Sequence, residues 1–142
     1  MAKKRHYGWV YVGDTPAGRT EKPTASVKHQ VEASMKPFIE KLKEQNINPI
    51  PEPHEHNHLI DIYGKWNRSF YYIYLTYKCP PEGYTKDKFD TGLVRMRYVG
   101  KNKFDLAYFR HTGQWWDISS ERDLTVAEAI DSIEKNPWFQ VY

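Results

Sequence analysis

Apolar and polar residues alternate along most of the chain between Leu59 and Ile118. A period of two is typical of strands that bury one face, and turn residues divide the pattern into five runs. Because the turns between these runs are mostly short, successive strands pair with each other and form an antiparallel meander. The predicted strands are Leu59–Trp66, Phe70–Lys78, Leu93–Val99, Phe104–Arg110 and Trp115–Ile118.

Helical spacing is found on both sides of this alternating region. In the segment Thr24–Gln45, apolar residues recur every three or four positions, which predicts an α-helix with one buried face. Pro37 lies inside this segment and has no backbone amide, so we expect a kink or two helical pieces. The run Thr125–Glu128 is a capping box, which predicts a second helix that ends near Lys135.

The order of these elements predicts a single α+β domain over residues 23–142. A helix, a five-stranded antiparallel meander and a second helix follow one another, and both helices are expected on one face of the sheet. Residues 1–22 form a basic, aromatic N-terminal arm and linker, because turn residues dominate Gly13–Lys22. The length suffices for a sizeable core without disulfides.

The same order of elements, over residues 24–135, resembles that of frataxin-like domains. The resemblance implies the fold only. The acidic residues with which frataxins hold iron are not matched, because the segment Val27–Gln45 carries lysines as well as glutamates. Iron binding is therefore not carried over to this chain.

Charge and composition narrow the class of protein. The net charge of +3 resides entirely in residues 1–22, so the domain itself is neutral. Only the basic arm could bind the phosphates of nucleic acid, and it would do so without sequence specificity. The single cysteine, Cys79, excludes an internal disulfide. No apolar run is long enough to span a bilayer and the N-terminus lacks a signal peptide, so we expect a cytoplasmic protein without a membrane partner.

Strand parity leaves a second sheet face that mixes aromatic and basic residues, and we expect the binding site there. Flat rings stack on bases and guanidinium groups pair with phosphate, so this face could hold single-stranded nucleic acid. It could equally bind a protein, join two copies in a homodimer, or be an ordinary solvated sheet. The predicted site residues are Tyr63, Arg95, Arg97, Phe109 and Trp115, with either Tyr71 or Tyr72 beside them.

Three histidines at alternate positions give a second candidate site. If His54, His56 and His58 are in an extended segment, their rings point the same way and could hold a transition metal such as zinc. The corresponding function is a metal-binding protein or a metal-dependent enzyme. The alternative is a solvated linker stiffened by the prolines nearby.

No other motif indicates catalysis or a cofactor. Phosphate-binding glycine loops are absent, and no nucleophile or carboxylate pair can be assigned. The sequence therefore favours a small binding or interaction domain over an enzyme, with an unknown ligand and no cofactor.

Overall fold

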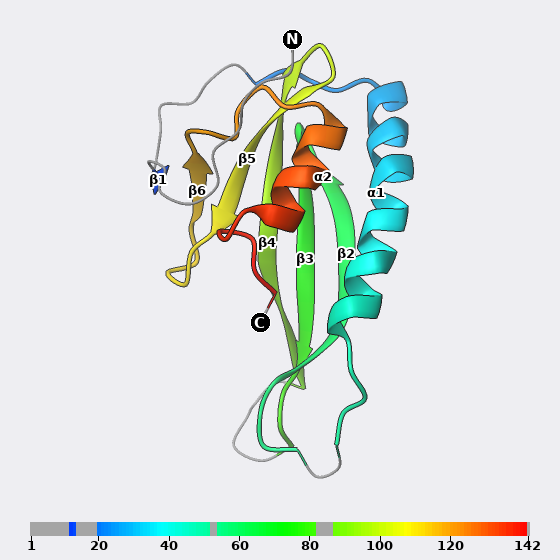
Figure 1. Cartoon of the computed structure of the whole chain (residues 1–142), viewed down its shortest axis with the longest axis vertical. Coiled ribbons are helices and arrows are strands. Elements are labelled where there is room, and N and C mark those ends of the chain that lie inside the picture. Colours follow the sequence, from blue (N-terminus) through cyan, green and yellow to red (C-terminus); the bar gives the residue numbers. More distant parts are fainter. Residues whose placement is uncertain (1–11, 14–19, 52–53, 82–86, 142) are drawn as a thin grey trace.

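A computed structural model describes residues 12–13, 20–51, 54–81 and 87–141 of the chain. They form one six-stranded antiparallel sheet in the order β1-β6-β5-β4-β3-β2, with two helices (Figure 1). The predicted α+β architecture is confirmed: along the chain, a helix is followed by a five-stranded meander and then by a second helix. The elements are β1 (Val12–Gly13), α1 (Ala25–Asn46), β2 (His58–Asn67), β3 (Phe70–Lys78), β4 (Lys88–Gly100), β5 (Lys103–Phe109), β6 (Trp115–Ile118) and α2 (Val126–Lys135).

Helix α1 is one continuous helix of 22 residues that passes through Pro37. The expected division into two pieces is therefore wrong. Thr24 caps its start by accepting a hydrogen bond from the amide of Val27 at 3.2 Å. Pro37 is exposed, so its ring lies on the solvent side while the apolar stripe of α1 packs on the sheet.

Helix α2 begins with the predicted capping box. The Thr125 hydroxyl accepts the Glu128 amide at 3.2 Å, and the Glu128 carboxylate accepts the Thr125 amide at 2.9 Å. The helix ends at Lys135, before Pro137, as expected. No described helix is long and apolar enough to cross a membrane.

A tight turn joins β4 to β5. Lys101 and Asn102 connect β4 to β5, and both have positive φ angles, near 53° and 57°. This conformation matches the twist of paired antiparallel strands. Beyond the meander, Val12 pairs with Ile118, so the short strand β1 adds a sixth strand at the β6 edge.

Both helices lie on one side of the sheet, with α1 alongside β2 and α2 in front of the central strands (Figure 1). The core forms between them and the sheet, and Ile62, Ile73 and Met96 are fully buried there. A bulge between Leu59 and Asp61 changes the parity of β2. Strict alternation places Ile60 in the core together with Ile62, and that expectation is wrong, because Leu59 is buried and Ile60 only half-buried.

Candidate functional site: the open sheet face

Six half-buried aromatic side chains form a continuous row on the face opposite the helices, which no described helix covers. We call this set the aromatic row. Ring centroids of neighbouring members lie 5.0 to 6.1 Å apart, the usual range for aromatic pairs. The row contains Tyr63 from β2, Phe70, Tyr72 and Tyr74 from β3, Phe109 from β5 and Trp115 from β6.

The row is continuous because Trp115 reaches across β4. Its indole lies 5.0 Å from the Phe109 ring and 5.4 Å from the Tyr72 ring, measured between centroids. Gly92 of β4 makes room for it, since a Cβ atom there would lie 2.5 Å from Cη2 of Trp115. A side chain at this position would push the indole away from its neighbours.

Two arginines and one aspartate form an ion triad beside the row. Nη2 of Arg95 lies 3.3 Å from Oδ1 of Asp117, and Nη2 of Arg97 lies 3.3 Å from Oδ2. The Arg95 guanidinium also lies over the rings of Phe70 and Trp115, at 5.1 and 5.9 Å from their centroids. The exposed fractions of the two arginine side chains are only 16% and 9%, so the triad is largely withdrawn from water.

Tyr63 and Asp90 form the polar end of the row. The Tyr63 hydroxyl donates to Oδ2 of Asp90 at 2.8 Å, and the Thr76 hydroxyl donates to Oδ1 at 2.6 Å. These hydrogen bonds stabilise the carboxylate, with that of Thr76 the larger effect, and lower the pKa of Asp90. Burial, reinforced by Asp90, raises the pKa of Tyr63 to about 12.

The five residues predicted for this site all belong to strands that form the open face. Tyr63, Phe109 and Trp115 are members of the aromatic row, and Arg95 and Arg97 are members of the ion triad. Of the two tyrosines left open, Tyr72 lies in the row, because Tyr71 is buried on the helix side.

Other members of the site were not predicted. Phe70 and Tyr74 belong to β3, which is apolar on both faces, so alternation alone could not separate its two sides. Gly92 and Asp117 gain their roles from contacts between different strands. The row in β3 could have been anticipated only by extending the parity of Tyr63 through the β2–β3 pairing, in which Tyr63 lies opposite Tyr74.

The three histidines do not converge, so their described positions give no support to the candidate metal site. The His54 ring is buried and its Nε2 lies 3.1 Å from the Cys79 carbonyl oxygen, whereas His56 is exposed. The rings of His54 and His58 meet edge to face at 5.2 Å. Because the chain bends at His56, alternate residues do not share a side, and the described residues contain no group of three ligands suited to a metal.

Comparison with known proteins gives a family but no assigned activity. No curated protein and no solved structure matches the chain. The likeness to frataxin-like domains therefore stays an expectation from element order. The model of one protein family, described as a domain of unknown function (DUF3024), matches residues 22–140. Since this match covers most of the chain, the protein belongs to the DUF3024 family.

Proposed function

We propose that the chain is a protein-binding module and that the aromatic row is its contact surface. The observation that carries this proposal is the row itself, six contiguous half-buried rings on an open sheet face. Contiguous apolar surface of this kind marks interaction sites in proteins. Tyrosine, tryptophan and arginine are also the residues that most often dominate binding energy at protein interfaces.

The arrangement of the rings favours a protein over single-stranded nucleic acid. Tyr72 and Tyr74 stack on each other with planes only 18° apart, and the Arg95 guanidinium lies over Phe70 and Trp115. Stacking of bases requires free ring faces, and here neighbours already use several of them. Tyrosine side chains that present ring edges and hydroxyl groups suit the mixed polar and apolar surface of a protein partner.

The charges of the face favour the same class of partner. Arg95 and Arg97 share the Asp117 carboxylate, so neither guanidinium is available to a phosphate without breaking an ion pair. Asp90 adds a negative charge that hydrogen bonds keep ionised next to the row. A nucleic-acid strand would meet this charge with repulsion.

The proposal is tested by photo-crosslinking in the cells that produce the protein. A photoreactive phenylalanine, p-benzoylphenylalanine, replaces Tyr63 or Trp115 at the two ends of the row, or Phe89 as a matched control. Phe89 is aromatic and 37% exposed, but it stacks on Tyr77 on the helix side of the sheet. We expect both row positions to give the same protein adduct and position 89 to give none.

Tyr72→Ala, combined with the photoreactive group at position 63, supplies the affinity test. Truncation at the centre of an interface typically costs more than 2 kcal/mol, so we expect the adduct yield to fall by roughly thirtyfold at limiting partner concentration. An adduct of twice the chain mass would identify the partner as a second copy. Equal adducts at positions 63, 115 and 89 would refute the proposal, and binding of fluorescent single-stranded oligonucleotides to the row would replace it with nucleic-acid recognition.

A further inference from the structure

A groove of about 600 Å³ opens on the helix side of the sheet, where β5 stops before β4 does. Strand β5 pairs with β4 only between Val94 and Gly100, and the pair of Val94 with Tyr108 lies at the end of this ladder. The β4 segment before Val94 pairs with β3 alone, through residues 88–92. The groove therefore occupies the place into which β5 would otherwise continue, and its volume is in the range of small-molecule sites.

The floor and one wall of the groove are apolar. Leu75 and Leu93 are buried beneath it, and the rings of Tyr108 and Trp138 lie 5.0 Å apart along its side. The segment after α2, which carries Trp138, is held by the buried Asn136 side chain. Its Nδ2 donates to Oε1 of Glu121 at 3.2 Å, and its Oδ1 accepts the Trp138 backbone amide at 3.1 Å. The groove is thus formed before any ligand binds.

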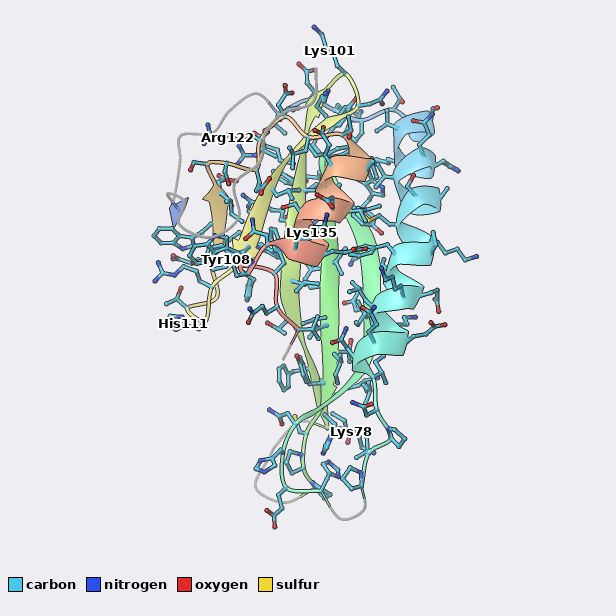
Figure 2. All side chains as sticks on the ribbon, viewed as in Figure 1. Lys78, Lys101, Tyr108, His111, Arg122 and Lys135 are labelled. Carbon is cyan, nitrogen blue, oxygen red and sulfur yellow. The ribbon has the colours of Figure 1, made fainter. Side chains whose placement is uncertain are left out.

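The Arg110 guanidinium places a positive charge at one end of the groove. Arg110 and His111 come from the turn between β5 and β6, and no aspartate or glutamate is among the lining residues. Figure 2 places Tyr108 and His111 at this end of β5. The Arg110 guanidinium lies 4.2 Å from the Trp116 ring centroid, and no carboxylate of the described segments forms an ion pair with it.

A buried hydrogen-bond donor adds to this pattern. The indole Nε1 of Trp138 is shielded from water and has no acceptor among the described residues. Buried donors in folded proteins almost always have partners. Because Trp138 lines the groove, movement of its indole on ligand binding would bring this donor within reach of a ligand oxygen.

We propose that this groove binds a small organic anion, a carboxylate attached to an aromatic or short aliphatic body. The body would lie on Leu75, Leu93 and the Tyr108 ring, and the carboxylate would pair with Arg110 at the open end. Most of the lining comes from the helix side of the sheet, and Phe109 is the one member of the aromatic row among the lining residues. The inference uses Arg110 and the apolar floor, so it does not depend on the protein-binding role of the row.

The test is a titration of the full chain with 3-phenylpropanoate, followed by NMR of the five tryptophan indole N–H signals. Trp138→Phe identifies the Trp138 signal by its disappearance. We expect a saturable shift of the Trp138 signal, while the signal of Trp66, which lies on β2 away from the groove, stays in place. Arg110→Gln should weaken binding roughly tenfold, the usual loss when a charge-assisted hydrogen bond is removed.

Two controls separate the anion site from nonspecific effects. Lys101→Gln removes an exposed cation at the opposite end of the sheet (Figure 2) and should leave the affinity unchanged. The neutral amide 3-phenylpropanamide should bind at least tenfold more weakly than the acid. Equal binding of acid and amide, no saturable shift of the Trp138 signal, or equal losses in Arg110→Gln and Lys101→Gln would each overturn the proposal.

Discussion

Asp117 is the residue on which the charge balance of the open face depends. Its carboxylate bridges the guanidinium groups of Arg95 and Arg97, each at 3.3 Å, and the aspartate side chain is only 6% exposed. Charges withdrawn from water are tolerated when they are paired and hydrogen-bonded. Removing the one carboxylate of the triad therefore leaves two poorly solvated cations side by side.

We predict that Asp117→Asn lowers the free energy of unfolding by about 3 kcal/mol, the usual penalty for breaking a buried ion pair. Urea denaturation followed by circular dichroism measures this loss. The control is Asp105→Asn, since Asp105 accepts the Asp123 amide at 2.8 Å in an exposed place and an asparagine oxygen can still accept it. Similar losses in both variants would contradict the role given to the triad.

Asp90 gives a pH-dependent prediction. Its pKa in the folded protein lies below the ordinary value of 3.8, because Thr76 and Tyr63 donate to the ionised carboxylate. The resulting stability is present above the unfolded pKa and is lost as the pH falls through the folded one. We therefore expect the stability of the wild type to fall more steeply below about pH 4 than that of Asp90→Asn.

Thr76→Val tests the cause of this shift directly. It removes the 2.6 Å hydrogen bond with little change of shape, so the Asp90 pKa should rise toward its ordinary value. NMR titration of the carboxyl group reports this pKa in both proteins. An unchanged pKa in Thr76→Val would show that another interaction holds the carboxylate in its ionised form.

Site residues could be predicted from sequence on strands with one apolar and one polar face, because there the alternation shows which face each side chain belongs to. Tyr63, Arg95 and Phe109 alternate with apolar neighbours, so parity placed them on the open side. Asp117 was not predicted because its role depends on how β6 lies relative to β4, two strands away in the sheet. Gly92 was not predicted because a glycine has no side chain through which a pattern could assign its face.

Among the elements, α1 shows how tertiary packing overrides a local conflict. The proline at position 37 removes a backbone hydrogen bond, yet the helix continues to Asn46. Its buried stripe extends on both sides of the proline, from Val27 to Leu42, and anchors both halves on the core. Burial along the whole helix offsets the local penalty.

We predict that Pro37→Ala raises the free energy of unfolding by roughly 1 to 2 kcal/mol. An alanine amide restores the missing helical bond, while the greater freedom of the unfolded chain cancels part of the gain. Thermal or urea unfolding measures the change, with Lys36→Ala, at a neighbouring exposed position of the same helix, as the control. A destabilised Pro37→Ala would mean that the proline ring makes a favourable contact of its own.

Helix α2 and the strands of the meander were predicted within a few residues of their observed ends, except that β4 begins at Lys88 rather than Leu93. The missed segment, Lys88–Gly92, contains only one large apolar residue, Phe89, and therefore resembled a loop. Bulges could not be predicted either, since an extra residue in one strand leaves no mark in composition. This explains why Leu59 and not Ile60 faces the core.

At the scale of the whole molecule, the two faces of the sheet should tolerate added volume differently. A Cβ atom at Gly64, on the helix side, would collide with the side chain of Tyr71, which is only 3% exposed. A Cβ atom at Gly92, on the open side, would meet the half-exposed Trp115. The indole can turn outward, whereas Tyr71 is confined by the core.

We therefore predict that Gly64→Ala lowers the free energy of unfolding by roughly 3 kcal/mol and Gly92→Ala by about 1 kcal/mol. Urea denaturation gives both values. The near-ultraviolet circular dichroism of Gly92→Ala should also change, because Trp115 leaves Tyr72 and Phe109. A larger loss in Gly92→Ala than in Gly64→Ala would show that the open face is as tightly packed as the core.

The pairing of β1 with β6 has a consequence for the order of folding. Most contacts of the sheet join strands that follow one another in the chain, so they form quickly, during or soon after synthesis. Val12 instead pairs with Ile118, near the other end of the chain, so this pair can form only after almost the whole chain has been made. We expect the amides of this pair to become protected last in pulse-labelled hydrogen exchange. The pairing of β1 with β6 would then be the last step in completing the sheet of a newly made protein.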